Sequence, residues 1–243
     1  MKTLVLLLLS ALCCKAQLDS ALGVPIIGIH FGAHLPGGDM VKRFGPNLCT
    51  GAQFLYKTKK NFIYGVEANY LFGSGVKEDV LKALKTPEGY VVDNAGYPAD
   101  IRVTERAITM HAIFGKIFRL ASANANSGLM VNVGVGFLQH KINLYDAQRN
   151  IAAIKGDRVY GYDRLTGGLS ITEFVGYLFL SENRMLNFYF GMDCYQSFSK
   201  SLRKLNYDTA QPDTKRRLDI LTGLRIGWAL PLYRKKPNDF YYN

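Results

Sequence analysis

Large apolar side chains alternate with small or polar ones in eight stretches of the chain. A period of two is typical of a β-strand whose two faces meet different surroundings. We therefore predict an all-β protein with eight strands. The predicted strands are Val24–Leu35, Leu48–Lys57, Asn61–Phe72, Arg106–Arg119, Leu129–Leu144, Leu165–Leu180, Met185–Phe198 and Leu218–Leu230.

The connections between these strands alternate in length. Tight turns are predicted at Thr58–Lys60, Ser122–Ser127 and Ser181–Asn183, whereas long connections follow the third, fifth and seventh strands. Short turns at one end and long loops at the other are typical of a transmembrane β-barrel. The pattern predicts an eight-stranded antiparallel up-and-down barrel with short periplasmic turns and long extracellular loops. Proline, which strand interiors disfavour, falls in the predicted connections at Pro36, Pro46, Pro87, Pro98 and Pro212.

The two faces of the predicted strands differ in a way that favours a membrane barrel. In the first strand Ile27, Ile29 and Phe31 share one face, and Gly28 and His30 share the other. A soluble sandwich or lipocalin-like barrel also alternates, but its outer face should be rich in Lys and Glu. Here the second face carries mostly Gly, His, Asn, Ser and Thr, which suits a narrow barrel interior.

Glu173 departs from the scheme because it falls on the apolar face of the sixth strand. A carboxylate facing lipid is unfavourable. Three explanations are open: a bulge that shifts the register, a position near the membrane boundary, or contact with a partner.

The N-terminus has the features of a secretory leader. Met1-Lys2 precedes the apolar run Leu4–Leu9, and the small residue Ala16 follows. We predict that residues 1–16 form a signal peptide, residues 17–231 the barrel and residues 232–243 a periplasmic tail. The apolar run is too short for a helical anchor. Cys13 and Cys14 leave a lipoprotein leader as an alternative, although Leu12 stands where a small residue is expected.

Composition and charge limit the partners. The 15 Tyr and 14 Phe suit aromatic girdles at membrane interfaces. The net charge falls from +11 to +9 when Lys2 and Lys15 are removed with the leader. A basic exported barrel is expected to meet outer-membrane lipid and lipopolysaccharide phosphates or an acidic protein, and no nucleic acid.

Charged residues on the inward face are predicted to form an interior ion cluster. Arg225 is expected to pair with Glu67 and Asp193, because buried charges need partners. A proton or ion path is the alternative. The spacing of the histidines and cysteines predicts no metal site and no cofactor. Cys49 and Cys194 have opposite parity, so we expect no bond between them, although either could bond to another chain.

No catalytic residue is predicted. Barrel enzymes that act on lipid A need a serine, a histidine and an acid near the outer surface. His34 and His140 lie near the outer ends of their strands, but no serine motif accompanies them. The protein is therefore predicted to be non-enzymatic. A lipid A-acting barrel enzyme and a surface adhesin are kept as alternatives.

The connections and the tail contain the remaining candidates. Lys77–Leu84 could form a helical turn or two, and Val91–Tyr97 reads as a hairpin. A basic and aromatic tail suits protein recognition, although it could also rest on lipid headgroups. The residues predicted to bind a partner are Tyr233, Arg234, Lys235, Lys236, Phe240, Tyr241 and Tyr242.

Three segments resemble a known family. They are Gly161–Gly168, Glu173–Tyr177 and Gly227–Tyr233 with the following Pro237 and Phe240–Tyr242. Together they resemble the small eight-stranded outer-membrane barrels of the Bacteroidota, most of all the barrel subunit of the type IX secretion ring complex. The resemblance implies a non-enzymatic component of that secretion machine. It would anchor a ring of a periplasmic lipoprotein and its partner to the outer membrane, with the periplasmic turns and the tail as contacts.

Overall fold

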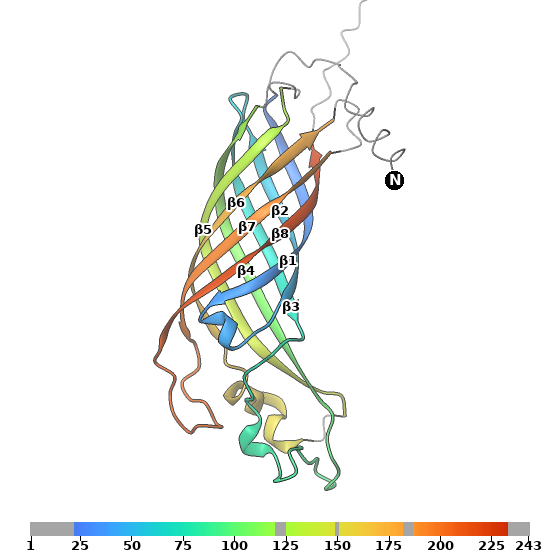
Figure 1. Cartoon of the computed structure of the whole chain (residues 1–243), viewed down its shortest axis with the longest axis vertical. Coiled ribbons are helices and arrows are strands. Elements are labelled where there is room, and N and C mark those ends of the chain that lie inside the picture. The colour runs from blue at the N-terminus through green and yellow to red at the C-terminus, as the bar shows by residue number, and fades with distance from the viewer. Residues whose placement is uncertain (1–21, 120–124, 149–150, 182–186, 233–243) are drawn as a thin grey trace, which may run out of the picture.

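The computed structural model describes residues 22–119, 125–148, 151–181 and 187–232 (Figure 1). The predicted leader, most of the predicted tail and parts of two short turns lie outside these residues. Eight strands form one closed antiparallel barrel in chain order, with β8 pairing back to β1. They are β1 (Val24–Gly38), β2 (Asn47–Lys57), β3 (Phe62–Gly73), β4 (Ile101–Phe118), β5 (Gly128–Asp146), β6 (Thr166–Leu180), β7 (Asn187–Ser201) and β8 (Arg216–Pro231). The predicted up-and-down barrel is confirmed.

The connections are long at one end of the barrel and short at the other (Figure 1). Four 3₁₀ segments lie in the long connections: η2 (Met40–Lys42), η3 (Lys82–Leu84), η4 (Ala152–Ile154) and η5 (Gly156–Gly161). The helix expected at Lys77–Leu84 is thus reduced to one 3₁₀ turn. The expected hairpin forms where Val92 pairs with Pro98, and the Asp93 carboxylate accepts hydrogen bonds from the backbone N–H groups of Ala95 and Tyr97.

Two strands extend beyond their predicted bounds. Pro36 lies within β1, not in a connection, because β1 continues to pair with β8 as far as Gly38. Its pairing with β2 stops at His34, so the strand has a free edge at Pro36, where proline is tolerated. β4 begins at Ile101 and pairs with β5 up to Asp146, so this hairpin extends further than the predicted strands.

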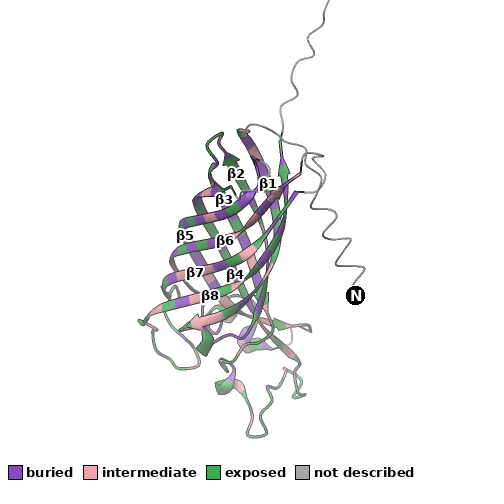
Figure 2. Cartoon of the chain, turned by 45° about the horizontal axis from the view of Figure 1, so that its top comes forward, coloured by how far each residue is buried: buried purple, intermediate pink, exposed green. Residues whose placement is uncertain are grey.

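Side chains alternate between the interior and the outer wall along every strand (Figure 2). The outer wall is apolar: Phe31 is 64% exposed, Leu224 65% and Trp228 59%. Among the described residues, no helix is both long and apolar enough to cross a membrane.

The register through Glu173 is continuous. Glu173 pairs with Val133 on β5 and with Cys194 on β7, and its side chain is exposed on the outer wall. A bulge is therefore not the explanation for this residue. The membrane boundary and a partner stay open.

The interior is filled in layers. An apolar cluster closes the short-turn end, with Val24, Ile26, Ile63, Ile117, Met130, Phe174, Leu178, Leu180, Tyr189 and Ala229. A second apolar cluster closes the long-connection end and includes Met40, Phe44, Leu71, Val80, Leu138, Ile142 and Leu221. Polar and charged side chains occupy the level between them.

Candidate functional site

The structure brings Arg225, Glu67 and Asp193 together inside the barrel. They come from β8, β3 and β7. The Arg225 guanidinium contacts both oxygens of Glu67, and its Nε and Nη2 lie 2.8 and 2.7 Å from Asp193 Oδ2. All three side chains are buried, so each charge depends on the others for compensation. These contacts across the lumen fix the positions of β3, β7 and β8 relative to one another.

Polar neighbours complete the hydrogen bonding of this ion cluster. Asn69 donates to Glu67 at 2.8 Å and to Thr109 at 3.0 Å. The Tyr195 hydroxyl accepts from Arg225 and lies 3.2 Å from Glu67 Oε1. Sequence reasoning missed Asn69 and Tyr195. The only available signal was their parity, because each lies two residues beyond a cluster carboxylate on the same strand face.

Two histidines extend the network. His30 lies 2.5 Å from Asn69 Oδ1 and 2.9 Å from the Tyr189 hydroxyl, and His34 Nε2 lies 2.9 Å from Asp193 Oδ1. The polar layer therefore reaches from β1 across the barrel to β3, β7 and β8. Because apolar clusters lie above and below it, the arrangement suits a structural cross-brace better than an ion path.

His111 differs from the other inward histidines. Among the described residues neither of its ring nitrogens has a hydrogen-bond partner, although its ring packs 5.6 Å from that of Tyr195. Asn132 Oδ1, Ser170 Oγ and Thr172 Oγ1 are also buried without partners in the described part. Buried polar atoms of this kind are the usual binding places of ordered water.

A serine, a histidine and an aspartate do meet inside the long-connection end. His140 Nε2 lies 3.0 Å from Asp219 Oδ2, and Ser199 Oγ hydrogen-bonds to the same oxygen. Nucleophilic catalysis needs the serine on the histidine, with the acid behind it. Here the carboxylate lies between the two, and all three side chains are buried. This arrangement does not activate the Ser199 hydroxyl as a nucleophile.

The two described cysteines are free. Cys49 is buried in the interior, and Cys194 lies on the outer wall, where the Thr222 hydroxyl lies 3.7 Å from its sulfur. Within the described chain, no group of three or more His, Cys, Asp and Glu side chains could hold a metal ion. The tail residues Tyr233, Arg234, Lys235, Lys236, Phe240, Tyr241 and Tyr242 lie outside the described residues.

Ion pairs tie the four long connections to one another. Glu78 bridges Arg43 at 2.8 Å and Arg164 at 2.7 Å. Arg164 also makes a two-pronged contact with Asp208, and Arg43 contacts Asp213 at 3.3 Å. One network thus joins the connections after β1, β3, β5 and β7. We call these linked connections the loop cap.

The charge of Asp213 depends on its surroundings in the loop cap. Burial opposes its ionisation, but the hydrogen bond from Arg217, the backbone N–H of Lys215 and the positive charges of Arg217 and Arg43 outweigh that effect. The pKa of Asp213 is therefore lower than that of an ordinary aspartate. The carboxylate stays ionised and keeps both arginines in place.

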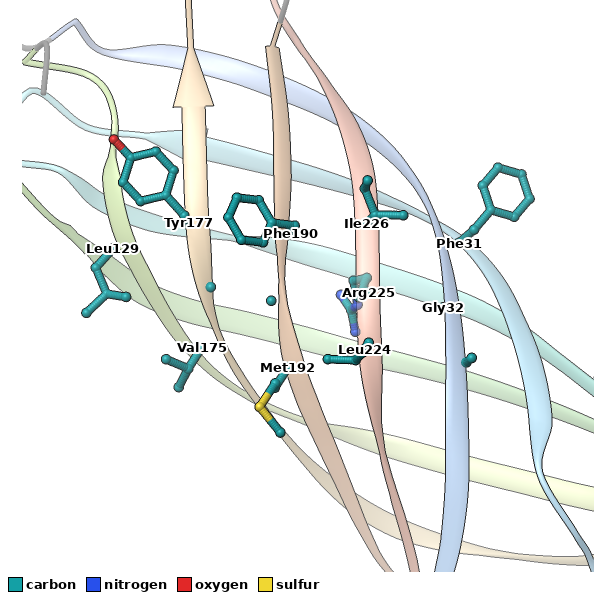
Figure 3. Close-up of a pocket in the computed structure, with 13 residues that line it drawn as sticks. Phe31, Gly32, Leu129, Val175, Tyr177, Phe190, Met192, Leu224, Arg225 and Ile226 are labelled. Atoms are coloured by element: carbon teal, nitrogen blue, oxygen red, sulfur yellow. The ribbon is translucent and has the colours of Figure 1, made fainter. Parts of the chain in front are cut away.

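A shallow apolar groove runs across the outer wall over β5 to β8 and β1 (Figure 3). It has a volume of about 760 Å³, and Leu129, Val175, Tyr177, Phe190, Met192 and Leu224 stand around it. Its floor is backbone, because Gly176 and Gly191 face each other on neighbouring strands. The groove continues the apolar outer wall and carries no chemistry of its own.

Comparison with known proteins gives a likeness of architecture. No family model and no curated protein matches the chain. Ail of Yersinia pestis, solved with the heparin analogue sucrose octasulfate, is 13% identical with a TM-score of 0.40, covering 85% of this chain and 98% of its own. Neisserial surface protein A is 8% identical with a TM-score of 0.41, covering 84% and 96%. OprG from Pseudomonas aeruginosa is 12% identical with a TM-score of 0.38, covering 88% and 99%. At such identities the likeness concerns the fold alone.

Proposed function

We propose that this protein is a non-enzymatic outer-membrane barrel that anchors a periplasmic assembly of a protein secretion machine. The observation that carries the proposal is the filled interior. An ion cluster held between two apolar clusters supports a rigid body better than a conduit. The apolar outer wall supports burial of that body in lipid, because a soluble barrel would not leave such a surface in water.

The short-turn end is the side that would face the periplasm. The first residues of β1 and the last residues of β8 lie there, and the Leu232 backbone N–H donates to the Pro25 carbonyl at 2.8 Å. Leu232 is the last described residue and lies at this end, which supports contact of the basic and aromatic residues 233–243 with a periplasmic partner. The resemblance of the three quoted segments to the type IX secretion barrel supports a ring lipoprotein and its companion as the proposed partner.

A mild-detergent pull-down from the native host tests the proposal. A tagged full-length chain should co-purify with periplasmic proteins identified by mass spectrometry, and deletion of 233–243 should remove them. Deletion of the 91–98 hairpin at the opposite end is the matched control and should leave them bound. An isolated barrel, together with normal secretion in a strain that lacks the gene, would overturn the anchoring role.

A second candidate function, surface binding, is favoured by the exposed tyrosines of the long-connection end. Tyr97 is 70% exposed, Tyr145 57% and Tyr207 51%, and they lie on three different connections or strand ends. Tyrosine provides contact area at a small loss of conformational freedom, which suits recognition. Replacing these three by serine should abolish host-cell or matrix binding if the protein is an adhesin. Secretion should be unaffected.

A further inference from the structure

Like charges face each other across neighbouring strands at two places on the barrel. Arg106 of β4 pairs directly with Lys141 of β5, and Lys200 of β7 pairs directly with Arg216 of β8. Two like charges directly opposite each other destabilise a sheet. An anion that binds between them removes this repulsion, so each pair is a candidate anion site.

Both pairs lie on the outer wall at the long-connection end. Lys200 follows the outward Phe198 by two residues, and Arg216 precedes the outward Leu218 by two. Residues two apart on a strand share a face. The Lys200 and Arg216 side chains are exposed, so the cations border the apolar wall directly.

The Lys200–Arg216 pair adjoins a basic pocket of about 310 Å³. The pocket lies between the β1–β2 connection and the start of β8, and five cationic and two acidic residues line it: Asp39, Lys42, Arg43, Glu78, Lys215, Arg216 and Arg217. Its excess of positive charge favours an anionic occupant.

Three cations at this place have no acidic partner among the described residues. Arg43 and Arg217 are satisfied by Glu78 and Asp213, and Lys42 pairs with Asp39. By contrast, Lys200, Lys215 and Arg216 form no ion pair with any described residue. Their charges are free to bind a ligand.

We infer that Lys200, Lys215 and Arg216 bind a phosphate group of a phosphorylated glycolipid in the outer leaflet. Lysine and arginine donate charge-assisted hydrogen bonds to phosphate oxygens. The exposed Phe198 and Leu218 next to these cations supply an apolar surface for the acyl chains, so a lipid fits better than a free phosphate. The inference rests on the proposed membrane location, with the long connections on the outside.

The opposite end of the barrel provides a contrast. The outward Lys116 lies over the rings of Phe62 and Phe118, at 4.8 and 5.6 Å from their centres, and Phe62 stands opposite it on β3. Lys59 and Lys60 belong to the short turn between β2 and β3. A triple substitution of these three lysines therefore removes the same charge at the end where no such site is inferred.

Native mass spectrometry of the purified full-length protein tests the site. The probes are bisphosphorylated lipid A, its dephosphorylated form and inorganic phosphate. Wild type should retain bisphosphorylated lipid A and release the dephosphorylated form. The variant Lys200→Gln, Lys215→Gln, Arg216→Gln should bind bisphosphorylated lipid A about tenfold or more weakly, because charge-assisted hydrogen bonds are lost. The control Lys59→Gln, Lys60→Gln, Lys116→Gln should bind like wild type.

The outcomes separate this inference from the proposed function. Equal lipid A binding by wild type and the triple variant would overturn the site, and so would tight binding of inorganic phosphate that displaces lipid A. If the triple variant folds poorly, Lys215→Gln alone, which alters no strand residue, should still weaken binding. A wild-type barrel that does not insert into phospholipid bilayers at all would instead overturn the membrane location.

Discussion

Arg225 is the residue on which the interior depends most. It forms ion pairs with both Glu67 and Asp193, and Tyr195 accepts a further hydrogen bond from it. Its guanidinium carbon also lies over the Phe174 ring, 5.3 Å from the ring centre. Loss of this one side chain leaves two buried carboxylates without their cation.

The variant Arg225→Met should therefore lower the free energy of unfolding by about 3–5 kcal/mol, the usual effect of breaking a buried ion pair from one side. Urea unfolding of the barrel in phospholipid vesicles measures this. Replacing all three charges, as Arg225→Met with Glu67→Gln and Asp193→Asn, should restore most of the loss. If the single and triple variants were equally unstable, the loss of stability would come mainly from lost packing and not from unpaired charge.

Glu173 is an acidic residue on the apolar outward face of β6. Its carboxylate stands among lipid-facing positions in mid-strand, with Val133 and Cys194 beside it. In partner-free bilayers, Glu173→Leu should raise the free energy of unfolding on the order of 1–2 kcal/mol, because an acidic residue on the lipid face is unfavourable. The control Val175→Leu should have little effect. An unchanged stability of Glu173→Leu would place the carboxylate in the headgroup region.

The alternation along each strand is enough to place Glu67, Asp193 and Arg225 on the inward face. They are expected to pair because few other charged residues face inward in the middle of the barrel. The sequence does not reveal which polar residues join them. Contacts across a lumen depend on the stagger of the strands around the barrel. The network of Asn69, Tyr195 and His30 could therefore not be predicted from a single strand's pattern.

Among the strands, the β4–β5 hairpin is longer than the sequence predicts. From Ile101 to Thr104, β4 turns the apolar Ile101 and Val103 inward and the polar Arg102 and Thr104 outward, whereas later in the strand the apolar side chains face outward. The inward–outward parity is unchanged, but the polarity of the two faces is exchanged because the strand leaves the apolar wall there and instead shields the core of the loop cap. A search for apolar side chains on one constant face ends at this exchange, five residues early.

The loop cap should respond to acid through Asp213. Its folded-state pKa lies below the unfolded value of about 3.9. The folded cap thus binds fewer protons than the unfolded one, and the stabilisation is complete above the unfolded pKa. It is lost as pH falls through the folded pKa, because protonation releases Arg43 and Arg217.

Hydrogen exchange of residues 202–215, corrected for the intrinsic pH dependence, measures this effect. Protection should be constant at neutral and mildly acidic pH and should fall below the ordinary aspartate range. Asp213→Asn should show weaker protection at neutral pH and a smaller acid-induced loss. Asp157→Asn, in an exposed segment of the cap, is the control and should behave like wild type. An acid response of full size in Asp213→Asn would assign the effect to another carboxylate.

For the molecule as a whole, the alternation in the sequence predicts the closed barrel that the structure shows. The strands, their order and the filled lumen follow from a repeated two-residue period with small and polar residues inward. The ion pairs of the loop cap do not, because they join connections far apart in the chain. The partner-binding role of the tail and the ring partner stay predictions.

We propose that the barrel is a filled body that anchors and does not conduct. Single-channel recording of the refolded full-length protein in planar lipid bilayers tests whether the lumen is closed. We expect no steady conductance above the bare bilayer, because apolar clusters close both ends of the polar layer. A stable open conductance that changes when Arg225 is replaced would contradict it, since ions would then be passing through the ion cluster.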